Sequence, residues 1–236
     1  MGDPIRRTLL LTGAAEGLGA SIAGTFATAG YDVVGLARTR RSQTHLDQRV
    51  EQGGGAYTHL TCDVAQPSEL AAVLQPHAAG IDVLVHNAHV LSIKPFERTT
   101  ASDFEHAWRV ACLGAMTSAQ MVLPHMIERG KGTIILTGAT AGIRGAAQFS
   151  AFASAKFALR GLAQSLAREF GPKGIHVAHV ILDGLIDEPQ TDRRFGPAQS
   201  ARMEPDAVAA TYLELASQRP SAWSHEIDLR PFTERF

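Results

Sequence analysis

Short apolar runs alternate with longer amphipathic stretches along the chain, and this alternation limits the fold more than any other feature. Several of the runs are apolar throughout, as strands covered on both faces of a sheet must be. The longest helical stretches are about 104–128 and 150–170. The order predicts an α/β fold, a single doubly wound Rossmann-type sandwich with a parallel sheet of about seven strands. Six strands are predicted at "TLLLT" (8–12), "DVVGLA" (32–37), "YTHLTC" (57–62), "DVLVH" (82–86), "TIILT" (133–137) and "HVAHVIL" (176–182).

The chain shows no internal repeat, linker or low-complexity segment. An α/β fold of this length is commonly one domain, so we expect residues 1–236 to form a single domain. The one long polar stretch with Pro and Gly is 187–204, which we expect to be a mobile loop on the ligand side of the sheet. A last helix (about 205–217) and a short strand, "HEIDLR" (225–230), close the domain.

Charge and cysteine content exclude several classes of function. The chain has 22 Lys and Arg against 23 Asp and Glu, with no block of like charge, so no nucleic acid or membrane partner is expected. Cys62 and Cys112 are too few and too far apart for a metal site or a disulfide framework. The apolar run in "RRTLLLTG" is too short for a signal peptide or a membrane span. We expect a soluble, cytoplasmic protein that acts on a small molecule.

The stretch "LLLTGAAEGLGASIAGTF" places three glycines, Gly13, Gly17 and Gly19, between the first predicted strand and the first predicted helix. Glycine lets the chain turn sharply and lets a pyrophosphate approach the backbone. The helix N-terminus supplies free N–H groups and a partial positive charge. The stretch therefore predicts a dinucleotide site.

With Thr12, the same glycines form TGxxxGxG, the signature of the short-chain dehydrogenase/reductase family, which this chain resembles over essentially its whole length. Other family landmarks follow in order: "CDV" (62–64), "HNAH" (86–89) where the family has NNAG, Lys156 of YxxxK, and "DGLI" (183–186) where the family has PG-x-I/V. The resemblance implies a Rossmann-type fold, a bound pyridine dinucleotide and oxidoreductase activity.

The resemblance also assigns contacts to the coenzyme. It implies that Asp63 binds the adenine amino group, that Asn87 lines the ribose and that Lys156 bonds the nicotinamide ribose hydroxyls. Ile186 is expected to offer backbone contacts to the carboxamide. The full set of expected coenzyme contacts is Thr12, Gly13, Glu16, Gly17, Leu18, Gly19, Arg38, Asp63, Val64, Asn87, Ala88, Lys156, Gly184 and Ile186.

The end of the second predicted strand bears on the choice between NAD and NADP. An acidic residue there would chelate the ribose hydroxyls of NAD, but the chain has Ala37 followed by Arg38, Arg40 and Arg41. A guanidinium can bind a 2′-phosphate bidentately, which favours NADP(H). Glu16 would repel that phosphate unless Arg38 neutralises it, so NAD(H) stays an alternative.

Most catalytic positions of the resembled family are occupied here by residues that lack the family's functional groups. Family members use Asn, Ser, Tyr and Lys: the tyrosine moves a proton to or from the substrate oxygen, the serine orients that oxygen, the lysine lowers the tyrosine pKa and holds the ribose, and the asparagine anchors a water relay. Only the lysine is kept here. The four positions are occupied by Ala111, Ala139, Phe152 and Lys156.

No neighbouring side chain fills these positions. The nearest hydroxyls lie a step away along the strand or roughly 200° around the helix: Thr137, Thr140, Ser150 and Ser154. The chain's three tyrosines lie near the second and third strands and in the last helix: Tyr31, Tyr57 and Tyr212.

Three groups are alternative proton carriers, and each has a purely structural explanation. His89 stands at the end of the fourth strand, where nicotinamide is expected, but His86 and His89 could instead fill space or bond a carbonyl. Asp183 lies beside the nicotinamide position or serves as a turn carboxylate. Burial of Lys156 among Phe and Ala would lower its pKa toward acid–base use, or the lysine only grips the ribose.

Two functions follow. The first is an NAD(P)(H)-dependent oxidoreductase that acts on a small carbonyl, alcohol or activated C=C substrate, over which 187–204 would close. The second is a catalytically degenerate NADP(H)-binding protein, such as a redox sensor or an assembly partner. The two long helices pair between subunits in most members of the resembled family, so a homodimer or homotetramer is expected.

Overall fold

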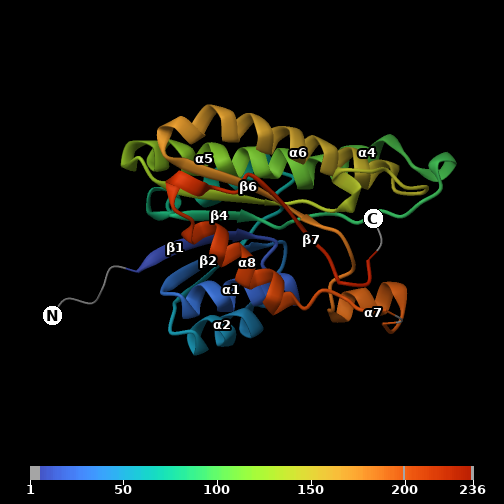
Figure 1. Ribbon diagram of the computed structural model, residues 1–236, viewed down its shortest axis with the longest axis horizontal. Helices are drawn as coiled ribbons and strands as arrows, with labels where there is room; N and C mark the ends of the chain where they lie inside the picture. The colour runs from blue at the N-terminus through green and yellow to red at the C-terminus, as the bar shows by residue number, and fades with distance from the viewer. Residues whose placement is uncertain (1–5, 199, 235–236) are drawn as a thin grey trace.

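Seven strands form one parallel sheet in the computed structural model, which describes residues 6–198 and 200–234 (Figure 1). The predicted α/β fold is confirmed, and each predicted strand lies within one residue of its observed bounds. The strands are β1 (Arg7–Thr12), β2 (Tyr31–Ala37), β3 (Tyr57–Thr61), β4 (Val83–His86), β5 (Gly132–Thr137), β6 (Ile175–Leu182) and β7 (Glu226–Leu229).

The strand order is β3-β2-β1-β4-β5-β6-β7, so the chain winds outward in one direction from β1 and then in the other from β4. Thr12 at the end of β1 lies opposite His86 at the end of β4. In such a sheet, ligands bind beyond the carboxyl ends of the strands at the point where the order reverses. The topology therefore places a ligand site next to Thr12 and His86.

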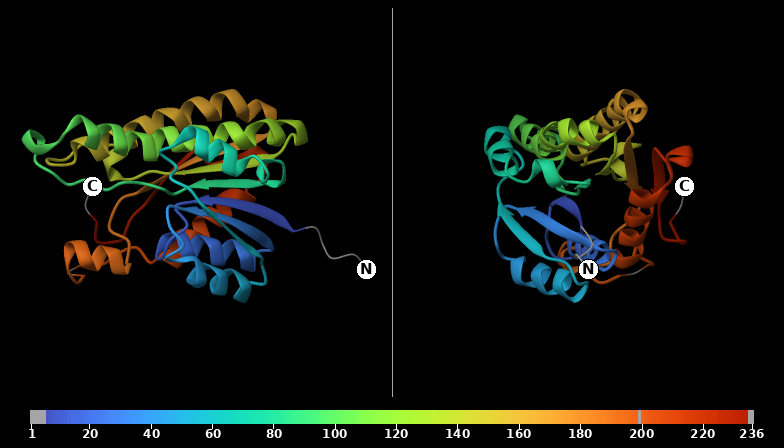
Figure 2. Two further views of the ribbon diagram at one scale, coloured as in Figure 1. Left: turned by 180° about the vertical axis from the view of Figure 1, so that it is seen from behind. Right: turned by 90° about the vertical axis from the view of Figure 1, so that its left-hand side faces the viewer.

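Helices cover both faces of the sheet (Figures 1 and 2). Because successive side chains of a strand point to opposite faces, Leu9 and Leu11 of β1 belong to one buried cluster and Leu10 to the other. The first cluster is covered by α1 (Leu18–Thr28), α2 (Gln43–Gln52) and α8 (Pro205–Ser217). The second is covered by α3 (Pro67–Leu74), α5 (Gly114–Arg129) and α6 (Ser150–Phe170).

The helix predicted at about 104–128 is longer than expected and contains a π-helical turn. It consists of α4 (Ala101–Trp108), a π-helical turn (Arg109–Leu113) and α5, which run on without a break as Ala101–Arg129. This segment is long and apolar enough to cross a membrane, but 56% of its most apolar window is buried inside the protein. Its apolar composition is explained by packing against the sheet and α6.

The polar stretch 187–204 is not one loop, contrary to the sequence-based prediction. It contains the short helix α7 (Pro189–Phe195), and Ile186 forms a parallel β-bridge with Met203. The two main-chain hydrogen bonds beside the bridge run from Asp187 N–H to the Met203 carbonyl and from Met203 N–H to the Leu185 carbonyl. Proline at the first position of α7 and these bonds give the stretch regular structure beyond the carboxyl edge of the sheet (Figure 1).

Candidate active site

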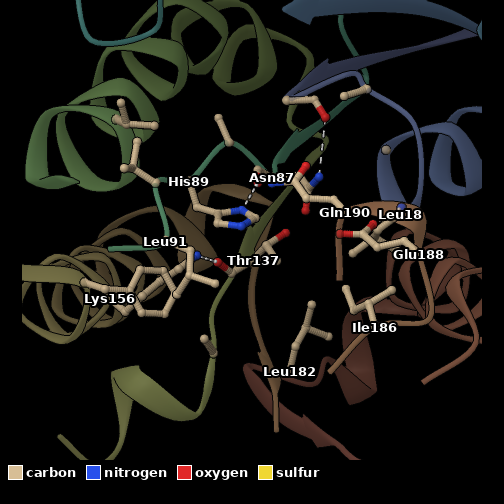
Figure 3. A pocket seen from close by; sticks show the side chains of 18 of the residues that line it. Leu18, Asn87, His89, Leu91, Thr137, Lys156, Leu182, Ile186, Glu188 and Gln190 are labelled. Atoms are coloured by element: carbon tan, nitrogen blue, oxygen red, sulfur yellow. Dashed lines mark hydrogen bonds between the residues drawn. The ribbon is translucent and has the colours of Figure 1, made fainter. Parts of the chain in front are cut away.

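A cavity of about 970 Å³ opens at the carboxyl ends of the strands, at the reversal point of the sheet (Figure 3). The segments that follow β1, β2, β3, β4, β5 and β6 all contribute to its wall. Its length runs from the residues after β2 at one end to Lys156 and Phe152 of α6 at the other. One large cavity at a switch point, with a few convergent polar groups, is the usual form of a cofactor and substrate site.

The glycine-rich turn between β1 and α1 brings backbone very close to backbone. Gly17 has φ +82° and precedes α1 without any side-chain cap, so the helix N-terminus keeps its N–H groups for another partner. A Cβ on Gly13 would lie 2.7 Å from Ala88 N, which no larger residue could tolerate. Thr12 does not line the cavity: it is fully buried, and its hydroxyl is hydrogen-bonded to His86 Nδ1 (2.8 Å).

Glu188 lies across this turn. Its Oε2 accepts a hydrogen bond from the Leu18 N–H (3.3 Å), and a Cβ built on Gly17 would lie only 1.9 Å from that oxygen. Burial raises the pKa of the Glu188 carboxyl above its usual value, and the Leu18 N–H acts in the opposite direction. The sequence-based prediction missed this residue, because Glu188 was read only as part of a polar loop 170 residues from Leu18.

The end of the cavity that follows β2 carries two arginines. Arg38 and Arg41 line it beside Ala37, whereas Arg40 does not and instead lowers the pKa of His59 by its charge, second to burial. Glu16 lines the same end and is exposed. Among the described residues no ion pair joins it to Arg38, so the expected neutralisation by contact is not observed.

Most of the remaining residues expected to contact a coenzyme line the cavity. Asp63 lines it, and its Oδ1 accepts a hydrogen bond from Ala65 N–H (3.0 Å), which fixes the carboxylate. Asn87 lines it and donates to the Gly13 carbonyl (3.4 Å), tying the end of β4 to the glycine-rich turn. Gly17, covered by Glu188, is absent from the wall, as is Thr12, whereas the other expected contacts are present: Gly13, Leu18, Gly19, Val64, Ala88, Gly184 and Ile186.

Lys156 is almost fully buried at the far end of the cavity, with 2% of its surface exposed. Its Nζ donates a hydrogen bond to the Thr137 carbonyl (2.6 Å) and lies 5.7 Å from the centre of the Phe152 ring. Loss of hydration lowers the pKa of Lys156 to about 7. The ammonium therefore keeps further N–H donors that this one carbonyl does not use.

The residues at three of the four expected catalytic positions form apolar wall or core. Ala139 and Phe152 line the cavity and pack with Phe149. Ala111 lies in the π-helical turn and is buried with small alanines of α4 and α6, outside the cavity wall. Within the described part of the chain no tyrosine lines the cavity. Tyr212 is fully buried on the other face of β5, where its hydroxyl is hydrogen-bonded to Thr137 Oγ1 (2.9 Å).

The two histidines at the end of β4 differ in role. His86 is fully buried between the Thr12 hydroxyl and the Val110 carbonyl, 3.1 Å from its Nε2, and burial lowers its pKa to about 3. This neutral ring links β1 to the π-helical turn, so the structural explanation holds for His86. His89 faces the cavity, and its Nδ1 lies 3.2 Å from the Asn87 carbonyl (Figure 3).

The bond to that carbonyl determines what His89 can do. A carbonyl oxygen only accepts, so Nδ1 carries the proton and Nε2 is left as an acceptor. The ring is exposed in the cavity, and desolvation by the protein on its other sides, aided by the Lys156 charge, lowers the pKa of His89 below its usual value. A neutral His89 has no proton to give at Nε2 and can only accept one there, as a weak base.

Asp183 does not have the surroundings of a catalytic acid. It is 2% exposed, and its Oδ1 accepts a hydrogen bond from the Thr140 hydroxyl (2.5 Å). Arg144 contacts the same oxygen at 3.5 Å, and Arg230 approaches Oδ2 at 3.3 Å. The Asp183 carboxylate is thus held in place by two guanidinium groups and joins the end of β6 to the segment after β7.

Comparison with known proteins agrees with this geometry. The family model for short chain dehydrogenase matches residues 7–194, well over half of the chain. The chain belongs to the short-chain dehydrogenase family. Within that family, it is 32% identical over 188 residues to the 2-dehydro-3-deoxy-D-gluconate 5-dehydrogenase of Bacillus subtilis, an alignment that covers 78% of this chain and 73% of the relative.

Solved short-chain dehydrogenases share the whole fold. A short-chain dehydrogenase from Rhodopseudomonas palustris superimposes with a TM-score of 0.83 at 36% identity, covering 97% of this chain and 100% of the other. A metagenomic short-chain oxidoreductase solved in complex with NADP superimposes with a TM-score of 0.82 at 26% identity, covering 95% and 97% of the two chains.

The residues of this short-chain dehydrogenase fit a pyridine dinucleotide along most of the cavity. The cradle is a turn in which a Cβ on Gly13 or Gly19 would lie 2.7 Å or less from backbone atoms, which leaves backbone exposed to a diphosphate. At the other end, buried Lys156 has unused N–H donors for ribose hydroxyls. One group opposes the fit: the Glu188 carboxylate covers Gly17 and must turn away before a diphosphate can reach the turn.

Proposed function

We propose that this short-chain dehydrogenase is an NADP(H)-dependent oxidoreductase that acts on a small carbonyl, alcohol or activated C=C substrate without a tyrosine proton donor. When bound, the nicotinamide supplies or takes up the hydride. The protein's own residues hold the two reactants, exclude water and accept a proton.

Burial of the Lys156 ammonium is the observation that carries this proposal. A buried ammonium is costly unless it is paired, and among the described residues no carboxylate forms an ion pair with Lys156. Among the described residues its one hydrogen bond goes to the Thr137 carbonyl, which leaves further N–H donors on a side chain that lines the cavity. A protein without a use for this group would be more stable with an apolar side chain there, so we infer that Lys156 holds the nicotinamide ribose.

The basic end of the cavity supports NADP(H). Arg38 and Arg41 line it where the ribose of the adenosine half would lie, and Ala37 offers no carboxylate for the hydroxyls of NAD(H). A guanidinium binds a phosphate with two parallel hydrogen bonds, which a ribose hydroxyl cannot match. A solved relative that holds NADP supports the same assignment.

Proton chemistry in this site favours substrates that need little acid help. Phe152 carries no exchangeable proton, and neutral His89 can accept a proton through Nε2. His89 would therefore serve as the base in alcohol oxidation. In the reductive direction, quinones, iminium ions and enones take up hydride without a strong acid at the same moment, whereas a simple ketone does not.

The wall around the reacting end indicates an apolar substrate. Phe152 and Phe149 lie with ring centres 6.5 Å apart, and the remaining side chains at this end are mostly apolar. The wall also holds polar side chains, among them Lys156, His89 and Arg144, of which Arg144 is turned to Asp183. Further apolar residues of this wall are Leu91, Ala139, Ala141, Leu185 and Phe195.

The proposal is tested by mixing the purified protein with NADPH and a panel of quinones, ketones, imines and enones while the coenzyme absorbance is followed. Turnover of quinones, imines or enones, with slow or absent ketone reduction, is the expected result. His89→Ala and Lys156→Ala would be compared for coenzyme affinity as well as rate. A loss in Lys156→Ala that is confined to affinity agrees with a ribose-holding role. Tight NADPH binding with no turnover of any substrate would reject the proposed oxidoreductase activity.

That outcome would favour the second candidate, a coenzyme-binding protein without turnover. Its specific support is that three polar positions of the family's catalytic set are apolar here, at Ala111, Ala139 and Phe152. Pairing of two or four chains stays a prediction for either candidate. Trp108 and Phe157, 43% and 44% exposed on the helices expected to pair, give that prediction an apolar surface that light scattering can test.

A further inference from the structure

A hydrogen bond joins the Glu188 carboxylate to the glycine-rich turn, where a coenzyme diphosphate is expected to bind. The turn leaves the N–H groups of α1 open to an anion, and Gly17 in particular has no side chain to cover them. Glu188 fills that opening from the other side of the cavity, with Oε2 3.3 Å from Leu18 N. The anion that the helix N-terminus binds in this structure is therefore the protein's own carboxylate.

The backbone that carries Glu188 is held firmly in place. On one side, Asp187 N–H binds the Met203 carbonyl next to the Ile186–Met203 bridge. On the other side, the Glu188 carbonyl accepts the N–H of Thr191 (2.9 Å) and so begins α7.

A buried guanidinium ties these two sides together. Arg202, with 6% of its side chain exposed, contacts Asp187 at 3.6 Å and Asp192 at 2.6 Å and donates to the Gly196 carbonyl. Because the backbone on both sides of Glu188 is fixed, rotation of the Glu188 side chain about its own bonds is the least costly way to clear the turn.

We propose that Glu188 is an affinity-determining residue of the coenzyme site: its carboxylate competes with the coenzyme diphosphate for the N-terminus of α1. This rests on the proposed coenzyme-binding function. The two groups cannot share the turn, because the space directly above Gly17 holds Oε2 and because two anions at this distance repel. A bound coenzyme therefore requires the carboxylate to leave, and a returning carboxylate helps to expel the coenzyme.

The contact holds the carboxylate only weakly. Among the described residues Leu18 N–H is its single hydrogen-bond donor, and no cation there forms an ion pair with Glu188. Burial without a counter-charge disfavours the ionised form. A diphosphate brings more negative charge to several N–H groups at once, so it can displace the side chain, at the cost of lower affinity.

The experiment compares coenzyme binding to the wild type, Glu188→Gln and Glu188→Ala by calorimetry, with no substrate present. Glutamine keeps the size of the side chain and removes its charge, and alanine removes both. Glu169→Gln, a change of the same kind at an exposed position of α6, is the matched control. We expect NADPH to bind both Glu188 variants about tenfold more tightly than the wild type, because a like-charge contact costs about this much even when water screens it.

A second ligand tests whether the effect acts at the diphosphate. Adenosine 2′-phosphate carries the adenine and the 2′-phosphate but no diphosphate, so its affinity should be the same in the wild type and in Glu188→Gln. Equal NADPH affinity in the wild type and both Glu188 variants would overturn the competition while leaving the coenzyme site intact. If Glu188→Gln raised the affinity for adenosine 2′-phosphate as much as the affinity for NADPH, the proposed competition would be overturned as well. Absence of NADPH binding to every variant would instead reject the proposed function.

Discussion

The ammonium nitrogen of Lys156 lies 5.7 Å from the centre of the Phe152 ring, one turn away on α6. In family members with a tyrosine at this position, the same spacing places a lysine beside a phenol. Here the ring face gives the cation only a weak attraction, about 0.5–2 kcal/mol, and offers no proton. The lysine thus lies beside a ring that has no exchangeable proton, at the end of the cavity where the proposed reaction would take place.

Restoring the hydroxyls should restore acid catalysis. In Phe152→Tyr/Ala139→Ser, a phenol replaces the ring beside Lys156 and a serine returns to the cavity wall. A positioned proton donor contributes roughly 10²–10⁴-fold, so ketone reduction should rise at least about 10²-fold. Adding Ala111→Asn would complete the set. Initial rates with NADPH and a panel of small ketones measure the gain.

The control for that gain is Phe149→Tyr, which adds a phenol to the neighbouring ring, 6.5 Å from Phe152 between centres. It should leave ketone reduction at the wild-type level. If the restored triple variant folds and binds NADPH but reduces no ketone, proton transfer was not the missing step.

Lys156 should make the stability of the coenzyme-free protein rise with pH. The folded protein releases this proton near pH 7, whereas the unfolded chain keeps it to about pH 10. Between these values the unfolded state binds more protons, so higher pH favours folding, by at most about 1.4 kcal/mol per pH unit. Urea denaturation at several pH values in this window should show the rise in the wild type and its loss in Lys156→Met.

Lys131→Met serves as the control, because Lys131 is exposed in the turn before β5. Its stability should follow the wild-type pH dependence. A rise that persists in Lys156→Met would mean that another group causes it and that the ammonium is hydrated in the folded protein.

Arg38 should distinguish the two coenzymes. Losing charge-assisted hydrogen bonds to a 2′-phosphate costs about 1.5–3 kcal/mol, so Arg38→Ala should weaken NADPH binding by roughly 10- to 100-fold. NADH, which lacks the phosphate, should bind as it does to the wild type. Arg40→Ala is the control, since Arg40 does not line the cavity. Equal losses for both coenzymes in Arg38→Ala would argue against a 2′-phosphate contact.

Asp183 should prove structural. Asp183→Asn leaves Arg144 and Arg230 facing a neutral amide at a buried position, and breaking a buried ion pair costs about 3–5 kcal/mol. Part of this cost is relieved where Arg144 reaches solvent, so we expect a loss of about 2–4 kcal/mol in the free energy of unfolding, measured by urea denaturation. A variant as stable as the wild type but slower in turnover would return Asp183 to the list of proton carriers.

The sequence alone determined the fold and the outline of the site. Strand positions, the glycine-rich turn and the lysine on α6 follow from patterns within a few residues of one another, and apolar periodicity and turn chemistry act over that range. Absence of the tyrosine was likewise visible, because Phe152 stands at a fixed spacing from Lys156.

Only the tertiary structure decided which distant side chains contact one another in the site. In the folded chain Glu188 contacts the glycine-rich turn 170 residues earlier, and Asp183 forms an ion pair with Arg230. His86 is hydrogen-bonded to Thr12 and to the π-helical turn. Each of these contacts depends on how separate β–α units pack and on which rotamer the packing allows, and no local pattern encodes either. The same packing removes water from Lys156, so its lowered pKa is a property of the folded cavity.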